Sequence, residues 1–315
     1  MAENSLLRIG VLACGRYVHS KTIWGPIIHP AAEPGPLSVG TRTTRMALTH
    51  AWDFDRKEAE AYAAAYPGLE LVERYDDMVG KVDGIILDDF LSCLHFRELA
   101  RPYLEAGVPI FINRPLAFNL GHAREILDLA RKHHTPIMSG SSFEYAPEVV
   151  QFKAQVAAAG PLRGYVAANS MSDFPTHGVH GLFMVYACVG GGIRSASYQT
   201  PDWRNPNGMV VIEYEARPGG KPFYGCVQEI SGTWGWIKVF GEQTCEQAVQ
   251  GGPYFWAALV HEMQRFFETR KMPQTYEELY EKTQLFLAAF KSNVEHGGAP
   301  VRLDEVGDWT APLLE

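Results

Sequence analysis

Two histidines three residues apart, His177 and His180, are the side chains best suited to acid–base chemistry. Histidine titrates close to neutral pH, so it can take up a proton and return it under physiological conditions. The pair opens an expected helix over residues 178–189, where it could also bind a metal ion together with Asp173 or Glu144. That spacing is loose for a metal site, and we favour proton transfer. A structural, hydrogen-bonded histidine is the alternative, and it is stronger for His177.

A modified phosphate-binding turn follows the first expected strand. In a G-x-G-x-x-G turn, backbone amides and the start of a helix approach a pyrophosphate. The three glycine positions read Ala13, Gly15 and Val18, so only the middle glycine remains, the one that most directly permits close backbone approach. Arg16 could add a phosphate contact, and we assign Tyr17 to the same site. The alternative is a structural turn that no longer binds NAD.

The end of the second expected strand supplies a carboxylate for an adenosine ribose. Asp53 stands there, where it can accept hydrogen bonds from the ribose hydroxyls and repel a 2′-phosphate. We therefore expect NAD as the cofactor, with NADP less favoured. Asp55 suits the N-cap of the next helix, so Asp53 is the better ligand candidate, and its neighbour Phe54 joins the expected site.

The elements that must position these residues fall into two patterns. In the first half, short apolar runs alternate with helical stretches, which indicates a doubly wound parallel sheet. The second half has strand-like alternation with helices, typical of an α+β domain with an antiparallel sheet. We expect domains over residues 1–145 and 146–315. The expected strands are 7–13, 45–52, 69–72, 82–87, 109–112 and 136–138, then 163–170, 195–199, 209–214, 224–230 and 236–240.

Composition restricts the class of protein. The chain has 315 residues, of which 46% are hydrophobic, enough for two domains with cores of their own. Its net charge of −8 argues against nucleic acid as the main partner. We expect no membrane segment and no export signal. The five cysteines are scattered and lack C-x-x-C spacing, which indicates a reducing compartment and a cytoplasmic protein.

By the order of its motifs the chain resembles the Gfo/Idh/MocA family of NAD(P)-dependent sugar and cyclitol oxidoreductases. The motifs that carry the resemblance are RIGVLACGRYVH, AWDFDRKEAEAYAAAYP, EAGVPIFINRPLAFN, HGVHGLFMVYACVGG, ISGTWGWIKVFG and GGAPVRL. The resemblance implies an N-terminal Rossmann domain and a C-terminal α+β domain with an open antiparallel sheet. It also implies a small, sugar-like substrate, and a homodimer or homotetramer formed through the open sheet.

The resemblance places the catalytic residues and shows two replacements. The family's Glu-Lys-Pro motif reads Asn113-Arg114-Pro115, with the proline often cis in the family. We assign Arg114 to catalysis and Asn113 and Pro115 to the cofactor site. Arginine cannot act as a general base, but it can polarise a carbonyl or clamp a carboxylate. The family's D-x-G-x-H motif places His180 at the general base and Thr176 at the aspartate. His177 is an addition that could take over part of the lost function.

Four further features depart from the family pattern or extend it. Small, uncharged residues are usual where this chain has Asp88-Asp89, and two carboxylates beside a pyrophosphate would repel it. They could point away, bind a ribose or coordinate a cation; a solvent-facing pair is the alternative. Glu144 could pair with Arg114 or contact a substrate hydroxyl, or lie on the surface. The proline-rich loop over 24–44 is functional or a surface insertion. The aromatic side chains that could line a sugar cleft or fill the core are Tyr17, Trp24, His95 and Trp203.

Two functions remain open at this point. The first is NAD-dependent oxidation or reduction of a sugar, cyclitol or related hydroxy or oxo compound, with His180 taking the hydroxyl proton and Arg114 holding the oxygen or a neighbouring carboxylate. The second is a non-redox lyase, hydrolase or isomerase, or a catalytically silent binding protein, on the same fold. The substrate itself is not identified by the sequence.

Overall fold

The computed structural model of the chain describes residues 6–15, 19–29, 43, 45–88, 90–169, 172–204, 207–230 and 232–313. It divides into two compact units. The first unit contains Met1–Ala117, His122–Gly140 and Gly252–Thr275, and the second contains Phe118–Gly121, Ser141–Gly251 and Tyr276–Glu315. The expected division at residue 145 differs from these bounds, because the chain leaves the first sheet at Gly140 and a late segment returns to the first unit.

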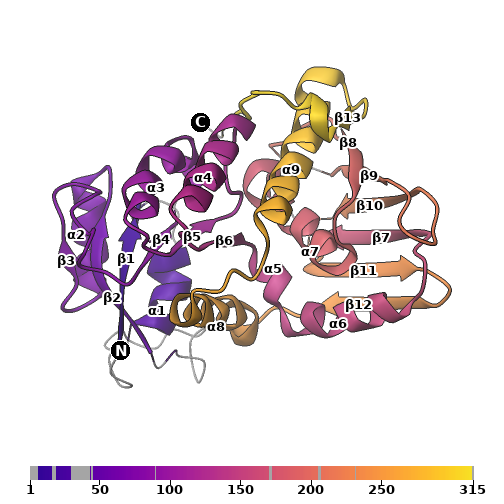
Figure 1. Cartoon of the computed structure of the whole chain (residues 1–315). Helices are drawn as coiled ribbons and strands as arrows, with labels where there is room; N and C mark the ends of the chain where they lie inside the picture. Colours follow the sequence, from indigo (N-terminus) through magenta and orange to yellow (C-terminus); the bar gives the residue numbers. More distant parts are fainter. Residues whose placement is uncertain are drawn as a thin grey trace. The chain divides into compact units, whose positions relative to one another are not determined.

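The first unit is built on a six-stranded parallel sheet in the order β3-β2-β1-β4-β5-β6. The order reverses beside β1, which is the doubly wound arrangement that the alternating pattern predicts. Figure 1 shows α3 and α4 on one face of the sheet and α1 and α8 on the other. The strands are β1 (Leu7–Leu12), β2 (Met46–Trp52), β3 (Glu70–Leu71), β4 (Gly84–Leu87), β5 (Ile110–Asn113) and β6 (Ile137–Gly140).

The helices of this unit begin and end at recognisable residues. Asp55 accepts the N–H of Lys57 at 2.9 Å and caps α2, as expected, and Pro67-Gly68 follows its end. Of the segment 24–44, Trp24–Ile28 are helical, whereas 30–42 and 44 lie outside the described residues. The helices are η1 (Ser20–Trp24), α1 (Gly25–Ile28), α2 (Arg56–Ala65), η2 (Phe90–His95), α3 (Phe96–Glu105), α4 (Leu120–Lys132) and α8 (Pro253–Thr269).

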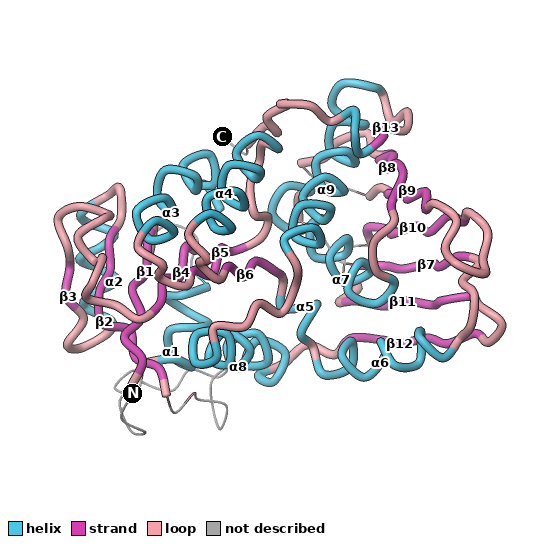
Figure 2. The backbone as a smooth tube through the Cα atoms, in the orientation of Figure 1, coloured by secondary structure: helices cyan, strands magenta, loops and turns pink. Residues whose placement is uncertain are grey.

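The second unit contains a seven-stranded sheet in the order β12-β11-β7-β10-β9-β8-β13, drawn as magenta strands in Figure 2. Its neighbouring pairs are antiparallel except β7 and β10, which run parallel, so the sheet is mixed. The expected fold class is confirmed. The strands are β7 (Gly164–Asn169), β8 (Ile193–Gln199), β9 (Met209–Tyr214), β10 (Phe223–Glu229), β11 (Gly235–Phe240), β12 (Thr244–Val249) and β13 (Val301–Arg302).

Helices cover one face of this sheet and leave the other open. Every residue of α7 except Ala187 is buried, while Val166 and Tyr224 are exposed on the opposite face. α6 packs beside β12, and α9 beside β8 and β13. The helices are α5 (Ser142–Tyr145), α6 (Pro147–Ala158), η3 (Phe174–Gly178), α7 (Val179–Val189), α9 (Tyr276–His296) and η4 (Leu303–Glu305).

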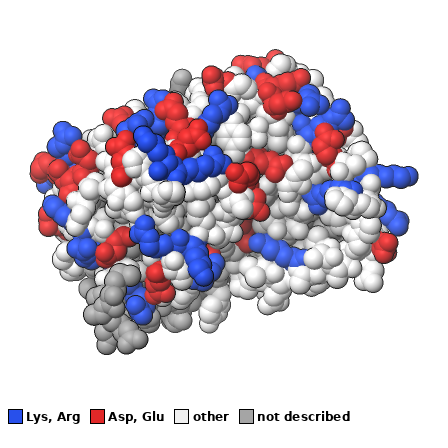
Figure 3. Space-filling model, viewed as in Figure 1, with Lys and Arg blue, Asp and Glu red and all other residues white. Residues whose placement is uncertain are grey.

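Charged side chains of both signs are mixed on the surface. On the face shown in Figure 3, acidic and basic side chains are interspersed over both units. Within the part of the chain that the structure describes, no helix combines the length and apolar character needed to cross a membrane.

Candidate functional site

The turn after β1 begins with a residue in the left-handed backbone region, which glycine adopts most readily. Ala13, at the first glycine position, has a φ of 54°, in the left-handed region that costs an alanine roughly 1–2 kcal/mol. Gly15 donates its N–H to Asp53 Oδ2 at 2.8 Å. A Cβ on Gly15 would lie 2.3 Å from the Cβ of Glu58, so this position requires glycine. The expected ligands Arg16 and Tyr17 lie outside the described residues, as does the whole stretch 16–18.

Asp53 links the end of β2 to this turn. The other oxygen of its carboxylate, Oδ1, accepts the N–H of Asp55 at 2.9 Å, and the residue is 9% exposed. The next residue, Phe54, is 54% exposed and packs against Trp52 and His95, with ring centroids 4.7 and 5.2 Å apart. An exposed aromatic ring beside the acid expected to bind a ribose suits stacking of an adenine.

Asp88 is fully buried, so the solvent-facing alternative is wrong for this residue. It accepts the N–H of Ser20 at 2.7 Å, at the start of the first helix, and the amide of Asn113 at 3.1 Å. His19 Nδ1 lies 4.0 Å from Asp88 Oδ1. The charge that we expected to repel a pyrophosphate is thus held by donors of the protein itself. The neighbouring Asp89 lies outside the described residues.

The Asn113-Arg114-Pro115 segment follows β5 in the first unit. Arg114 is 4% exposed, and its backbone N–H donates to Asn113 Oδ1 at 2.9 Å. The peptide bond between Arg114 and Pro115 is cis. Asn113 also donates to the backbone oxygen of Asp88 at 2.9 Å. The acid that the family motif carries at position 113 is therefore replaced by an amide that bonds to an acid from the neighbouring strand.

His180 lies in the first turn of α7 in the second unit, 7% exposed. Its Nδ1 is 2.6 Å from Ser141 Oγ. The ring of Phe143 lies 5.5 Å away and that of His177 6.0 Å away, centroid to centroid. A histidine bonded through Nδ1 can use Nε2 to exchange a proton with a substrate.

A carboxylate compensates for the aspartate that Thr176 replaces. Asp173 accepts the Thr176 hydroxyl at 2.5 Å and contacts His177 Nδ1 at 2.9 Å. Burial alone would raise the pKa of Asp173, but the hydrogen bonds from His177 and Thr176 outweigh it and lower that pKa below its usual range. The sequence supplies the same kind of group three residues earlier than the family motif.

Glu144 is 1% exposed, so its alternative interpretation as a surface acid is wrong. One carboxylate oxygen accepts the N–H of Ser141 at 2.7 Å, and the other accepts the ammonium of Lys282, also at 2.7 Å. Burial lowers the pKa of Lys282, although Glu144 acts in the opposite direction. The Lys282 ammonium also lies 4.4 Å from the ring centroid of Phe183. The sequence could not reveal this pair, because 138 residues separate its members.

A second buried acid lies at the end of β10. Glu229 is 2% exposed and accepts the Tyr198 hydroxyl at 2.7 Å. Burial raises the pKa of Glu229 to about 7. Asn169, its partner in the ladder between β7 and β10, is 1% exposed. Within the described residues, neither the side-chain amide of Asn169 nor Glu229 Oε1 has a hydrogen-bond partner. Buried polar atoms of this kind can bind water or a ligand.

The aromatic candidates divide between core and surface. Trp24 stacks on His19, with centroids 4.9 Å apart, and Trp203 packs against Phe290, so both belong to the core. His95 is exposed, and Tyr17 lies outside the described residues. Trp234, which was not among these candidates, is 39% exposed and 5.7 Å from the ring of Phe143 beside His180.

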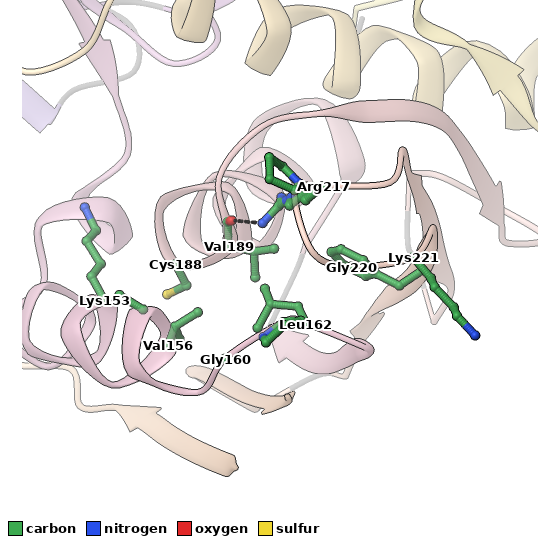
Figure 4. A pocket seen from close by; sticks show the side chains of 13 residues that line it. Lys153, Val156, Gly160, Leu162, Cys188, Val189, Arg217, Gly220 and Lys221 are labelled. Carbon is green, nitrogen blue, oxygen red and sulfur yellow. Dashed lines mark hydrogen bonds between the residues drawn. The ribbon is translucent and has the colours of Figure 1, made fainter. Parts of the chain in front are cut away.

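The described residues contain no group of three or more His, Cys, Asp and Glu side chains placed to hold a metal ion. A hollow of about 420 Å³ lies at the C-terminal end of α7, the end opposite His180. Figure 4 shows Arg217 turned toward the carbonyl of Val189, which it bonds at 2.7 Å, while Lys153 and Lys221 extend away from each other. The three cations do not converge on one ligand position.

The residues of the first unit fit a dinucleotide. The turn approaches the acid at the end of β2 closely, as Gly15 and Asp53 show, and Asp88 is compensated by its own donors. This is the arrangement expected for the ribose-binding part of a Rossmann site.

Comparison with known proteins agrees with this geometry. Residues 8–141 match the family described as "Oxidoreductase family, NAD-binding Rossmann fold". An uncharacterized protein of Saccharomyces cerevisiae, YMR315W, is 24% identical over 127 residues, which are 39% of this chain and 36% of the yeast protein. The match thus spans about a third of that relative's length.

Solved structures share the fold of almost the whole chain. Myo-inositol dehydrogenase from Lactobacillus casei, in complex with NAD(H) and myo-inositol, superposes with a TM-score of 0.77 at 14% identity, over 94% of this chain and 96% of the other. A probable dehydrogenase from Thermotoga maritima gives a TM-score of 0.74 at 15% identity, over 95% and 100% of the two chains. The resemblance stated from the motifs is confirmed over residues 8–141, which match the NAD-binding Rossmann domain of the Gfo/Idh/MocA oxidoreductase family, while the solved structures share the fold of almost the whole chain.

Proposed function

We propose that the protein is an NAD-dependent oxidoreductase that acts on a hydroxyl or oxo group of a sugar, cyclitol or related small molecule. The observation that carries this proposal is His180, held through Nδ1 by Ser141 at the start of α7. A histidine in this setting can take the proton of a hydroxyl group while the carbon loses hydride. The polar side chains Asn169 and Glu229 and the partly exposed ring of Trp234 suit a polyhydroxylated substrate.

Each unit contributes its own residues to this function. Gly15, Asp53 and Phe54 would hold the adenosine part of NAD, which supplies hydride transfer when bound. His180 takes the hydroxyl proton at Nε2. Arg114 holds the substrate oxygen or a neighbouring carboxylate with charge-assisted hydrogen bonds and leaves proton transfer to the histidine, since it does not titrate near neutral pH.

We also propose a preference for NAD over NADP, a homo-oligomeric assembly and a cytoplasmic location. Asp53 would repel the 2′-phosphate of NADP. The open face of the second sheet, with Val166 and Tyr224 exposed, suits a homodimer or homotetramer. Scattered cysteines without C-x-x-C spacing favour a cytoplasmic protein.

Titration of the protein with NADH, followed by calorimetry or fluorescence transfer, tests the proposal. We expect saturable binding in the micromolar range, weaker binding of NADPH, and at least tenfold weaker NADH binding by Asp53→Ala. Asp55→Ala is the matched control, because Asp55 only caps α2. If neither nucleotide shows saturable binding, the protein is not an NAD-dependent enzyme.

Arg114→Lys then separates redox chemistry from the non-redox alternative. If the arginine replaced a working lysine, the variant gains dehydrogenase turnover with polyols, measured as NADH formation. A protein that binds NADH, yet forms none with any polyol in either version, would support a lyase, hydrolase or isomerase that uses Arg114 and the histidines as polar catalysts.

A further inference from the structure

A buried tyrosine hydroxyl enters the backbone hydrogen bonds of the first helix. Tyr66, the C-cap of α2, is 2% exposed, and its hydroxyl donates to the carbonyl oxygen of Ser20 at 3.1 Å and to that of Lys21. A carbonyl oxygen can only accept, so the direction of both contacts is fixed, and the one hydroxyl hydrogen is shared between the two oxygens. Burial raises the pKa of Tyr66, which therefore keeps this hydrogen at neutral pH.

The hydroxyl replaces a donor that the helix lacks. η1 is a π-helix, in which the N–H of Gly25 bonds to the carbonyl of Ser20, five residues earlier. The next bond of this kind would join residue 26 to Lys21, but Pro26 has no N–H. Tyr66 supplies the missing hydrogen. Gly25 leaves room for it, because a Cβ at position 25 would overlap the Tyr66 hydroxyl.

The residue that Tyr66 holds also binds the buried acid at the end of β4. The N–H of Ser20 donates to Asp88 Oδ2 at 2.7 Å, and Ser20 itself is fully buried. The amide of Asn113 donates to the other oxygen of Asp88 at 3.1 Å, and the ring of His19 lies 4.0 Å from that oxygen. Because the two ends of Ser20 belong to one short helix, a change of register there would move its N–H away from Asp88.

Asp88 lies where a dinucleotide is expected to pass. The strand order reverses between β1 and β4, and in doubly wound sheets the ligand lies at this point, outside the carboxyl ends of the strands. Asp88 follows β4 directly, and its N–H donates to the carbonyl of Leu12, the last residue of β1, at 3.3 Å. A carboxylate at this place repels a pyrophosphate unless hydrogen-bond donors compensate its charge.

We propose that Tyr66 is a positioning residue for the dinucleotide: it keeps the first helix in its π register, so that the N–H of Ser20 stays on Asp88 and compensates its charge beside the pyrophosphate. The proposal rests on the NAD binding that belongs to the proposed function, and not on the oxidation itself. The adenosine part of the cofactor, which Asp53 and Phe54 would hold, does not depend on Tyr66.

Titration of Tyr66→Phe with three ligands tests the proposal. We expect NADH and ADP-ribose, which both carry the pyrophosphate, to bind about tenfold more weakly than to the native protein, because a buried carbonyl loses its donor and the helix its register. Calorimetry measures both. Adenosine, which has no phosphate and is followed by ligand-observed NMR, should bind as it does to the native protein.

Tyr62→Phe is the matched control and should leave all three affinities unchanged. Tyr62 is as deeply buried as Tyr66 and packs against it, with ring centroids 4.9 Å apart. Among the residues that the structure describes, however, no carbonyl of the first helix accepts its hydroxyl. Gly25→Ala is a second route to the same effect, since its Cβ would displace the Tyr66 hydroxyl, and it should give the same pattern as Tyr66→Phe.

A double-mutant cycle with Asp88→Asn separates the charge from a general loss of structure. Without the charge of Asp88, adding Tyr66→Phe should weaken NADH binding by less than about twofold, whereas a tyrosine that only stabilises the fold would cost the same in both backgrounds. Amide hydrogen exchange of Gly25 reports the helix without any ligand. We expect it to be about tenfold faster in Tyr66→Phe and unchanged in Tyr62→Phe.

Three outcomes would overturn the proposal: native affinity for NADH in Tyr66→Phe, an equal loss of adenosine binding, or an equal loss in the Asp88→Asn background. If the native protein binds NADH and Tyr66→Phe binds it equally well, only the proposal fails. If the native protein binds neither NADH nor ADP-ribose, the proposed function fails with it. A protein that binds NADH as expected but oxidises no polyol would leave the role of Tyr66 intact.

Discussion

The buried acids of the two units have different partners. In the first unit, the hydrogen bonds described for the two acids come from groups that do not titrate: Asp53 accepts two backbone N–H groups, and Asp88 accepts one together with the amide of Asn113. The His19 ring lies 4.0 Å from Asp88, beyond hydrogen-bond distance. In the second unit, Asp173 and Glu144 also accept backbone N–H groups, but each adds a titratable side chain, His177 or Lys282.

The two kinds of partner suit the units to different tasks: the first unit holds a fixed backbone shape, and the second exchanges protons. Backbone amides do not titrate, so the acids of the first unit hold the turn after β1 and the start of the first helix in one shape, which suits binding of a nucleotide by main-chain groups. Acids bonded to histidine and lysine couple the structure to protonation, which suits proton transfer. The following variants test how far the comparison holds.

The largest difference should appear when each unit loses one carboxylate to an amide. Glu144→Gln leaves the charge of Lys282 buried without its counter-charge, and we expect a loss of about 3–5 kcal/mol in the free energy of unfolding. Asp88→Asn keeps an acceptor for Ser20 but turns an NH2 group toward the donating amide of Asn113, so it should cost less, about 1–3 kcal/mol. Urea denaturation of both variants at pH 7 measures the difference. Equal losses would contradict the comparison.

Glu229 gives the second effect, visible in its pH dependence. The pKa of about 7 lies above the usual range of glutamate, so the folded state binds the proton more tightly than the unfolded state. The free energy of unfolding therefore falls as the pH rises from that usual range to above 7. Glu229→Gln mimics the protonated acid, and we expect it to stabilise the protein by about 3 kcal/mol at pH 8 and hardly at pH 4.

Thermal unfolding of the Glu229→Gln variant between pH 4 and pH 8 checks this expectation. A constant difference between Glu229→Gln and the native protein would mean that burial does not control Glu229.

Asp173 should behave in the opposite sense and more weakly. Its pKa is lowered in the folded state, so its stabilisation is present at neutral pH and is lost as the pH falls through the folded pKa. Because His177 is partly exposed, we expect Asp173→Asn to cost only about 1 kcal/mol at pH 7. The gap to the native protein should close on acidification, as followed by urea denaturation. A gap that widens in acid would refute the sign.

The smallest effect concerns the shape of the turn in the first unit. Ala13→Gly removes the left-handed strain but adds freedom to the unfolded chain, so we expect a gain of about 0.5–1 kcal/mol. Ala64→Gly, in the exposed part of α2, is the control and should lose about 1 kcal/mol. If both variants are destabilised, the turn does not hold Ala13 in the left-handed region in solution.

The sequence predicted the elements better than the partners of the polar residues. Fully buried strands such as β4 and β5 carry their own local pattern, and the structure contains them within two residues of the expected bounds. Asp55 caps α2 as expected. β12 was missed because its polar composition, with alternate residues exposed, gives little strand pattern.

The site shows the same limit. His180 was found because a motif contains it, whereas Ser141 and Lys282 became visible only through long-range contacts. Likewise, Asp88 looked like a repulsive charge in the sequence and is a helix-capping acid in the fold. Spacing along the chain identifies groups on one element, but not those that meet across elements.

The return of α8 to the first unit has a consequence for synthesis on the ribosome. Phe267 of α8 lies so close to Gly84 in β4 that a Cβ there would be 2.5 Å from the ring. The first unit therefore lacks part of its core until residue 275 has been made, after most of the second unit. The first unit therefore remains incomplete while the second sheet is translated. During that time the apolar surface of β4 is uncovered, and we expect chaperones to bind there.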